Sequence, residues 1–572
     1  MHKQLLILGC SQTKRQVSGL LPAIDRYDGS HYRVLRNYLH NKQWPDNLSI
    51  AILSAKYGLI GGFANIENYD ERMSSAKASE WAPHCQDILE KWSRNHSRIY
   101  FSLGKDYMPA VMPTIEKKLR DKSEVFNGPI GLKLHQTKEF LEKTEALNKK
   151  HFSNYPEPGT GRISYFLPDW DDLLDENFDF ELDKFSGFSR QNRNDKHCSI
   201  LIKKKMSDGI LVSLAQHISS KGPLKKIIGT DPLSLSPINL HSQYRLKENQ
   251  YLFGDCGAFS YVNDEIPAIS SEQAFAIYDL YGFNFGASVD HIPVPIVHRD
   301  GQKVSLNELE RKKRVSITKK NAEKFIELAK KRKEPFIPVG TVQALSPKEY
   351  AKTVSYYHSI GYRYMAIGGL VPLPDGVIEE IVKNVMNVVK KLKPRPWIHL
   401  FGIFRPKLQN VFREYKIDSF DSASYFRKAW LRSDQNYLST NGKWYAAIRV
   451  PMTSDGRTRK YIESKGLSVD NLEALESKAL TLLNKFDKDE VGTGEVLDTI
   501  IEYDKHFERS SETTSSLRSK YRKTLEDRPW RKCDCQFCKN VGIHVLIFRG
   551  ANRNKRRGAH NTLMLYRSLK KI

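Results

Sequence analysis

Short apolar runs alternate with longer stretches of helical periodicity over roughly the first 120 residues of the chain. The apolar runs lie at residues 5–8, 50–53 and 99–103, and the helical stretches at 30–40 and 82–95. Short buried strands that alternate with amphipathic helices are typical of an α/β domain. We therefore predict a doubly wound α/β domain over residues 1–150, followed by a linker at the Pro/Gly-rich run YPEPGTG.

A second alternation extends from about residue 195 to 430. Its β-like runs lie at 200–202, 286–289, 336–339, 365–368 and 397–402, and its helical segments at 271–280, 307–331, 346–360 and 378–392. Repeated βα units predict a (β/α)8 TIM-like barrel, which we place at residues 160–430. A doubly wound sheet gives the same alternation, so periodicity alone leaves both architectures open.

The last part of the chain has a different character. Residues 431–530 are polar and charge-rich, with a helix expected at 471–485, and we treat them as an insertion of unknown role. Residues 531–572 contain a cysteine cluster and a basic tail, which together predict a C-terminal zinc-binding subdomain.

Composition narrows the class of protein. Forty per cent of the 572 residues are hydrophobic and 27% are charged, as in an ordinary globular chain. We find no stretch typical of a membrane span or a secretory signal, and seven sparse cysteines argue against a disulfide framework. We expect a cytoplasmic protein that does not bind membranes. The net charge of +25 predicts a polyanionic partner such as nucleic acid, although solvated lysine faces alone also give such a charge.

Three cysteines lie within six residues, at Cys533, Cys535 and Cys538. This spacing lets one turn surround a tetrahedral ion, and His560 would complete a Cys3His site for structural Zn²⁺. His544 is the rival fourth ligand.

The tail that follows carries eight basic and no acidic residues from Arg549 to Ile572. Phosphates are the natural counterpart of such a tail, and a solvated charged tail is the alternative. The residues that we predict to contact nucleic acid are Arg549, Arg553, Arg556 and Arg557 from this tail, together with Arg427.

Four aspartates lie where a predicted strand gives way to a loop: Asp255, Asp290, Asp418 and Asp421. In a barrel these strand ends converge on one pocket. Glycosyl transfer needs one ionised carboxylate to attack the anomeric carbon and another to move a proton on the base. Any single aspartate could instead be a helix cap or a turn residue.

These carboxylates lie in motifs that resemble those of tRNA-guanine transglycosylases. The run DCGAF at 255–259 resembles that family's Asp-Ser-Gly-Gly-Phe motif, and FDSASYFR at 420–427 resembles its nucleophile loop. Further matches keep the family's order: VQ at 342–343, IGGL at 367–370, HLFG at 399–402, and the three cysteines with His560. The resemblance covers roughly residues 195–565.

The resemblance implies a role for each matching residue. Asp421 would be the nucleophile that forms a covalent glycosyl intermediate, and Asp255 the acid/base. The implied base-binding residues are Asp290, Gln343, Gly368, Gly369 and Leu370. Cys256 and Ala258 depart from the family's Ser and Gly, and the insertion before Cys533 has no counterpart in the tRNA enzymes.

Within this superfamily, the runs PDWDD at 168–172 and FRGANRNKRRGAHN at 548–561 resemble the DpdA branch, which places 7-deazaguanine derivatives in DNA. The resemblance implies a transglycosylase that exchanges guanine in DNA for a base such as 7-cyano-7-deazaguanine. A tRNA-guanine transglycosylase and a catalytically silent nucleic-acid-binding protein remain the alternatives.

The N-terminal domain resembles the DUF6884 family, through polar loops that directly follow apolar strands. The candidate pocket residues are Cys10, Lys14, Ser30 and His31, which loosely resemble the nitrile-modifying core of archaeosine synthase. A Cys10 thiolate could attack the nitrile of a 7-cyano-7-deazaguanine base. A phosphate- or base-binding accessory domain is the alternative.

Overall fold

The computed structural model describes residues 3–17, 20–39, 48–143, 156–169, 173–187, 195–202, 204–215, 240, 244–247, 249–332, 336–431, 434–507 and 514–570. The chain divides into two compact units, one of Met1–Arg162, Leu211–Gln243 and Tyr251–Ser419, the other of Ile163–Ile210, Tyr244–Gln250 and Phe420–Ile572. Residues 170–172 of the PDWDD run lie outside the described residues. None of the described helices is both long and apolar enough to cross a membrane.

The N-terminal part of the first unit is a five-stranded sheet in the order β4-β3-β1-β6-β7. Its strands are β1 (Gln4–Gly9), β3 (Leu48–Ser54), β4 (Gly58–Gly61), β6 (Arg98–Ser102) and β7 (Ser123–Val125). Strand β1 pairs in parallel with β3 on one side and β6 on the other, while β4 is an antiparallel edge strand. The chain leaves β1 toward β3 and later crosses to β6, so the topological switch point lies between the carboxyl ends of β1 and β6.

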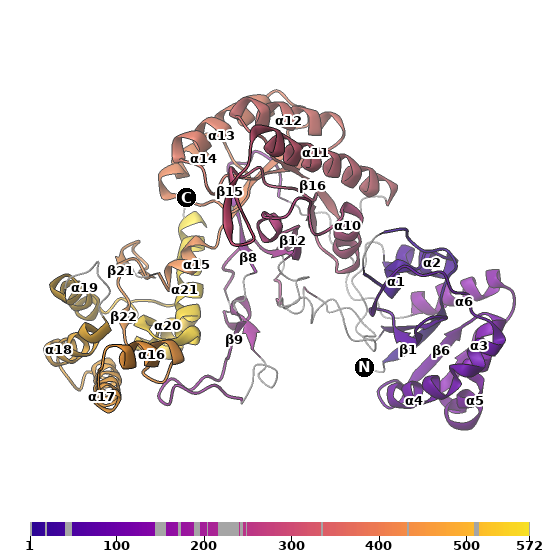
Figure 1. Cartoon of the computed structure of the whole chain (residues 1–572), viewed down its shortest axis with the longest axis horizontal. Coiled ribbons are helices and arrows are strands. Elements are labelled where there is room, and N and C mark those ends of the chain that lie inside the picture. The colour runs from indigo at the N-terminus through magenta and orange to yellow at the C-terminus, as the bar shows by residue number, and fades with distance from the viewer. Residues whose placement is uncertain are drawn as a thin grey trace. The chain divides into compact units, whose positions relative to one another are not determined.

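Helices cover both faces of this sheet (Figure 1). The helices are α1 (Ala23–Arg26), α2 (Ser30–Leu39) and α6 (Ile130–Lys143) on one face, and α3 (Ser75–Glu80), α4 (Ala82–Ser93) and α5 (Met112–Thr114) on the other. Alternate residues of β1 face opposite layers: Leu5 packs in the cluster of Leu89 from α4, and Leu6 in that of Leu35 from α2. Burial on both faces explains the unbroken apolar run. The predicted doubly wound domain is confirmed.

Eight strands form a closed barrel, in the order β11-β12-β13-β16-β17-β18-β19-β8. The strands are β8 (Ser164–Pro168), β11 (Gly209–Ser213), β12 (Tyr251–Asp255), β13 (Phe285–Ala287), β16 (Ile337–Val342), β17 (Tyr364–Ile367), β18 (Trp397–Leu400) and β19 (Ser419–Asp421). Their order around the barrel is their order in the chain, and closure distinguishes this fold from a doubly wound sheet. The predicted barrel is confirmed.

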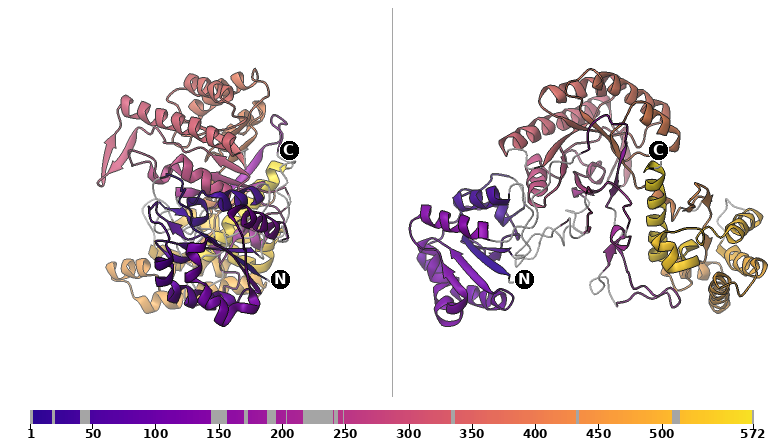
Figure 2. Two further views of the ribbon diagram at one scale, coloured as in Figure 1. Left: turned by 90° about the vertical axis from the view of Figure 1, so that its right-hand side faces the viewer. Right: turned by 180° about the vertical axis from the view of Figure 1, so that it is seen from behind.

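The outer layer consists of helices that curve around the strands (Figure 2). They are α10 (Ser271–Leu280), α11 (Glu308–Lys331), α12 (Pro347–Ser359), α13 (Asp375–Val389) and α14 (Gln409–Glu414). Ser270, Asn307 and Ser346 cap the first three, each accepting a backbone N–H three residues on. These caps explain why the helix starts were predictable from the sequence.

The strand predicted at 200–202 is wrong. Cys198–Leu201 form a short 3-10 turn with His197 as its N-cap, and the first two barrel strands are β8 and β11 instead. A short apolar run cannot by its pattern alone distinguish a strand from a buried turn.

The C-terminal part of the second unit is mostly helical. Four helices occupy the predicted insertion: α16 (Gly456–Ser464), α17 (Val469–Asp487), α18 (Thr493–Asp504) and α19 (Thr514–Asp527). The last helix, α21 (Gly550–Lys570), packs on α15 (Ser424–Lys428), which directly follows β19. Gly558 permits this approach, because a Cβ there would lie 2.8 Å from the Phe426 carbonyl oxygen. The four predicted domain boundaries stay a prediction.

Candidate active site and metal centre

Three polar side chains meet beyond the carboxyl ends of β12, β13 and β16. Gln343 donates from Nε2 to Asp290 Oδ2 at 2.6 Å, and the Cys256 thiol donates to Asp290 Oδ1 at 2.9 Å. All three side chains are buried. Asp255, the last residue of β12, brings one carboxylate oxygen within 4.8 Å of both the Cys256 sulfur and an Asp290 oxygen. The barrel thus gathers two carboxylates, an amide and a thiol in one place.

A tyrosine that no sequence motif indicated holds this group together. The Tyr261 hydroxyl donates to the Asp290 carbonyl at 2.9 Å and lies 3.0 Å from the Cys256 sulfur. Tyr350 acts similarly on the neighbouring strand end, where it donates to the Gly368 carbonyl at 2.9 Å. Neither tyrosine belongs to a recognisable motif, and only the fold brings them here.

Burial sets the protonation of this group. Burial raises the pKa of Asp290, although the hydrogen bonds from Cys256 and Gln343 oppose the shift. Burial, followed by the nearby Asp290 and Asp255 carboxylates, raises the pKa of the Cys256 thiol well above its usual value. Cys256 therefore remains a thiol and serves as a hydrogen-bond donor.

Two glycines let the Gln343 amide lie against the backbone. A Cβ at Gly368 would come within 2.3 Å of Gln343 Nε2, and one at Gly369 within 2.6 Å of Gln343 Oε1. Gly369 also has a φ of +73°, which favours glycine. Among the described residues, nothing donates to the buried Gln343 Oε1, so this acceptor is available to a ligand. Leu370 is fully buried behind the glycines.

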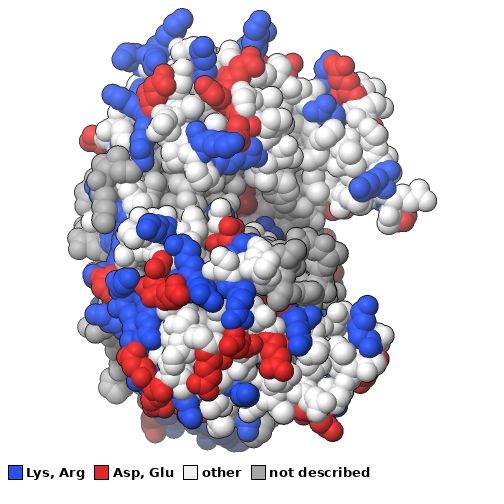
Figure 3. Space-filling view, turned by 90° about the vertical axis from the view of Figure 1, so that its left-hand side faces the viewer, with Lys and Arg blue, Asp and Glu red and all other residues white. Residues whose placement is uncertain are grey.

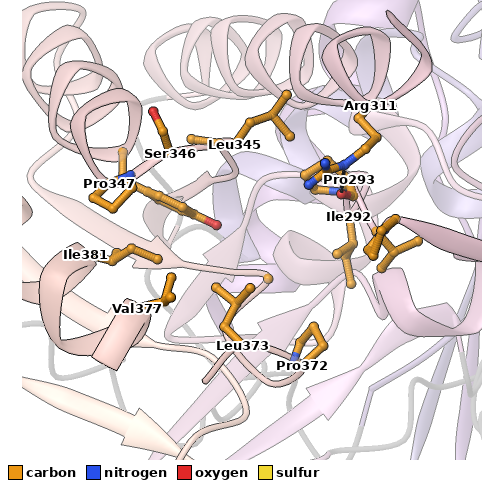
Figure 4. A pocket seen from close by; sticks show the side chains of 15 residues that line it. Ile292, Pro293, Arg311, Leu345, Ser346, Pro347, Pro372, Leu373, Val377 and Ile381 are labelled. Atoms are coloured by element: carbon orange, nitrogen blue, oxygen red, sulfur yellow. Dashed lines mark hydrogen bonds between the residues drawn. The ribbon is translucent and has the colours of Figure 1, made fainter. Parts of the chain in front are cut away.

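An apolar pocket opens beside these groups (Figure 4). Its lining includes Gly369, Tyr350 and the loop residues Ile292 and Leu345, with Ile381 from α13. Arg311 is the one cation among the lining residues, and its Nε donates to the Pro293 carbonyl at 3.0 Å. The pocket can therefore accept an apolar or weakly polar group next to Gly369.

The two remaining aspartates have different environments. Asp421 is the last residue of β19 and is buried, and Tyr165 fixes the next residue by donating to the Ser422 carbonyl at 2.9 Å. Asp418 accepts hydrogen bonds from Arg395 at 2.9 and 3.0 Å and from the Ile398 backbone at 2.8 Å. Its carboxylate is thereby committed to the structure, which leaves Asp421 as the candidate reactive group of this pair.

The three cysteines and His560 form a buried cluster. His560 Nδ1 lies 3.7, 3.3 and 3.4 Å from the sulfurs of Cys533, Cys535 and Cys538. These distances fit the edges of a tetrahedron about a zinc ion, which are about 3.6 Å for a sulfur and a nitrogen ligand. Nε2 of His560 lies 2.7 Å from the Leu438 carbonyl, which suits a ring whose other nitrogen faces a metal. The residues therefore could hold a metal ion.

His544 does not belong to this cluster. Its Nδ1 lies 3.3 Å from a guanidinium nitrogen of Arg553, and its ring packs against Phe180. Burial and the nearby Arg553 lower the pKa of His544 to about 4. The rival assignment of His544 as fourth ligand is therefore not supported by the geometry.

The structure buries all four tail arginines that we predicted to contact nucleic acid, which does not favour that role. Their exposed fractions are 6% for Arg549, 1% for Arg553, 5% for Arg556 and 0% for Arg557. Arg549 and Arg553 both pair with Asp183, and Arg556 donates to the Asp175 carbonyl at 2.8 Å.

Arg557 donates only to uncharged oxygens in the described structure, chiefly the carbonyls of Ala429, Val545 and Ile547. Burial lowers the pKa of Arg557 to about 9. Arg427 differs from these four because it is exposed. On the face drawn in Figure 3, basic and acidic side chains are interspersed rather than gathered into one basic field.

The candidate residues of the N-terminal domain lie on two segments, the one that follows β1 and the start of α2. Cys10 follows β1 and is half-buried, and Lys14 is buried near it. His31 instead contacts Ser102 at the end of β6, 2.9 Å away, and burial together with Lys133 lowers the pKa of His31 to about 4. Ser30 is the exposed first residue of α2.

Comparison with known proteins agrees with this division of the chain. A family of unknown function, DUF6884, matches residues 5–142. A DNA-guanine transglycosylase of Salmonella montevideo is 33% identical over 413 residues, which are 71% of this chain and 97% of the relative. These matches confirm the resemblance of the N-terminal domain to DUF6884 and that of the chain to DNA-guanine transglycosylases.

The burial of Arg557 predicts a structural role. Arg557→Ala should lower the free energy of unfolding by about 3 kcal/mol, because it leaves several buried carbonyl groups without donors. Arg567→Ala, which removes a partly exposed pair with Asp534, should cost less than about 1 kcal/mol. Urea unfolding measures both. Equal, small effects would mean that Arg557 is not part of the packed interior.

The raised pKa of Asp290 predicts that the free energy of unfolding depends on pH. Folding favours the protonated form of Asp290, so protonation of this residue stabilises the folded protein. This contribution to the free energy of unfolding is complete below the pKa of the unfolded chain and is lost as pH rises through the pKa of the folded protein. Asp290→Asn removes this titration but replaces one acceptor oxygen with an N–H donor, so its free energy of unfolding relative to the unaltered protein should rise from pH 4 to pH 8. Thermal melts across this pH range can show the rise. Glu379→Gln, at an exposed site, is the control; a pH-independent effect of Asp290→Asn would contradict this assignment.

Proposed function

Because the chain belongs to the family of DNA-guanine transglycosylases, we propose that it exchanges guanine in DNA for a free 7-deazaguanine base, such as 7-cyano-7-deazaguanine. The observation that carries this proposal is the buried Asp290–Gln343 pair beside Asp255, with Gln343 Oε1 lacking a donor among the described residues. This arrangement suits a flat base rich in N–H donors.

Guanine and 7-deazaguanine share the edge that such a site would read. Both present N1–H and an exocyclic amino group, which are donors for the Asp290 carboxylate and for Gln343 Oε1. The Asp290 oxygens accept hydrogen bonds from Cys256 and Gln343, and each oxygen has a second lone pair that a ligand can use. A substituent at position 7 needs additional space, and the apolar pocket beside Gly369 supports that requirement.

The chemistry needs two carboxylates. Asp421 would attack C1′ of the target deoxyribose, which breaks the bond to guanine N9, while Asp255 as the acid delivers a proton to the departing base. The incoming base would then lose its N9 proton to Asp255 and attack C1′, releasing Asp421. Two displacements at the same carbon retain its configuration.

Two observations support DNA as the polymer. One is the similarity to the Salmonella DNA-guanine transglycosylase, and the other is a pair of exposed side chains outside the barrel core. A base in duplex DNA must leave its stack before Asp421 can reach C1′. The enzyme must therefore contact the DNA backbone and place an aromatic side chain in the vacated space. Arg427 is exposed just after Asp421, and Phe259, just after Asp255, is 54% exposed. Phe426 is buried, so it is not suited to that role. A tRNA-guanine transglycosylase is the second candidate, because the same chemistry serves either polymer.

We also propose that the ion of the Cys3His cluster is zinc with a structural role. Four protein ligands fill a tetrahedral site, so no position remains for a reactive water. Zinc there would tie α21, which carries His560, to the segment that carries the cysteines.

The assay that tests the function offers labelled 7-cyano-7-deazaguanine with duplex DNA and with tRNA in parallel. We expect incorporation into DNA, and loss of at least about a thousandfold in rate for Asp421→Asn with an unchanged melting temperature, since the nucleophile is removed but packing is kept. Nucleosides from each polymer are measured by mass spectrometry.

Asp418→Asn is the matched control for that assay. It should lower stability, because it breaks the contacts with Arg395, and its folded fraction should still exchange bases. Incorporation into tRNA alone would replace the DNA assignment with the second candidate. Normal exchange by a folded Asp421→Asn protein would refute Asp421 as the nucleophile.

The zinc assignment predicts one zinc ion per chain by elemental analysis of protein purified without added metal. Cys535→Ser should lose the ion and melt at a lower temperature, because metal binding stabilises the folded state. His544→Ala should keep the ion, since His544 lies against Arg553 instead. Zinc retained by Cys535→Ser, or lost from His544→Ala, would contradict the ligand set.

A further inference from the structure

A largely buried lysine in the N-terminal domain, Lys14, has no role in the proposed exchange reaction. Lys14 is 7% exposed, and its Nζ lies 4.4 Å from the ring centre of Tyr69 and 5.9 Å from that of Tyr27. Among the described residues, no carboxylate or other hydrogen-bond acceptor pairs with this ammonium. Most of the lysine side chain is enclosed, but its Nζ is not among the fully enclosed atoms without a partner, so an anion from outside the chain can reach it.

The surroundings of Lys14 are positive or neutral. Tyr69 Oη lies 2.6 Å from Tyr27 Oη and 2.8 Å from Ser54 Oγ, so these hydroxyls satisfy one another. Burial raises the pKa of Tyr27 and of Tyr69, which keeps both phenols neutral. A second ammonium, that of Lys56, lies 5.8 Å from the Tyr69 ring. Two ammonium groups therefore lie near the neutral Tyr69 ring, and together they favour an anion at this site.

The site around Lys14 and Tyr69 adjoins the topological switch point of the sheet, where ligands of doubly wound domains bind. Cys10 follows β1, and its sulfur lies 3.2 Å from the hydroxyl of Tyr107, which belongs to the turn after β6. The same thiol interacts with Tyr69, the ring beneath Lys14. The N-terminus of α2 is close, because a Cβ at Gly29 would lie 2.4 Å from Ser11 Oγ. Helix N-termini favour phosphate groups.

We propose that the N-terminal domain binds a phosphate-bearing ligand of the nucleotide class, with the phosphate on Lys14 and with Cys10 beside it, next to the same Tyr69 side chain. Three features support a phosphate: the unpaired Lys14, the nearby Lys56 and the start of α2. The tyrosine rings offer surfaces on which a base can stack. This site is separate from the residues proposed for base exchange, and the matching family has no known function.

The chain carries its own reporter for this site. All seven cysteines lie within the described residues, and Cys10 alone among them is not buried. Iodoacetamide should therefore alkylate Cys10 first in the folded protein, as peptide mass spectrometry can measure. A ligand at this site should protect it. With guanosine 5′-monophosphate at about ten times its Kd, the alkylation rate should fall about tenfold.

Variants of Lys14, and ligands that lack one part of the nucleotide, show what the phosphate and Lys14 each contribute to binding. Guanosine without a phosphate should protect little, and inorganic phosphate alone should protect partly. Lys14→Met should abolish protection by the nucleotide while the free protein is alkylated at its usual rate. Lys91→Met, at an exposed position of α4, should retain full protection.

Two results would overturn the proposal: no protection by the nucleotide or by phosphate in the unaltered chain, or equal protection in Lys14→Met. If Lys14→Met does not fold, Lys14→Arg keeps the charge and should retain protection. Titration calorimetry of the unaltered chain with the same nucleotide then gives an independent readout. Neither measurement uses base exchange, so their outcome is independent of the proposed reaction.

Discussion

The hydrogen bond between Gln343 and Asp290 links the segments that follow two neighbouring barrel strands, β13 and β16. Asp290 is buried, so its carboxylate needs donors from the protein in place of water, and Gln343 and Cys256 supply them. Tyr261 then orients both the thiol and the backbone of Asp290. Because the Gln343 amide lies against the following strand, residue 369 must be a glycine. Asp290 is buried without a full counter-charge, which suits the N–H donors of the base proposed to bind there.

The net charge of the chain does not describe its surface. Several guanidinium groups lie inside the second unit, where Asp183 neutralises Arg549 and Arg553 and backbone carbonyls surround Arg557. Helix α21 therefore directs part of its basic sequence inward, and its Gly558 packs on the segment just after Asp421. The buried arginines thus help to hold α21 against the segment that follows the candidate nucleophile, Asp421. Attraction of a polyanion must come from exposed residues such as Arg427.

The sequence predicted the elements that carry strong local signals. Helix starts followed from capping residues such as Ser270 and Asn307, and the buried strand β1 from its unbroken apolar run. Local signals fail where a partner is distant: Arg549 meets Asp183, 366 residues earlier in the chain, and no spacing rule reveals that pair. Motifs located Asp290 and Gln343, because parallel strands end at one edge. The same motifs could not locate Tyr261, whose position depends on how the turn after β12 folds.

The buried charges of this chain differ in what surrounds them, and that difference separates structural groups from binding groups. Arg553 has a carboxylate partner and Arg557 has several carbonyl oxygens, so each is complete without a ligand. Asp418 is likewise complete, through Arg395 and two backbone N–H groups. Lys14 is different, because within the described structure its ammonium contacts only aromatic rings. A cation–π contact contributes about 0.5–2 kcal/mol, less than the cost of burying an unpaired charge. The absence of an acceptor for Lys14 among the described residues is what supports the proposed anion site, in a domain whose matching family has no assigned function.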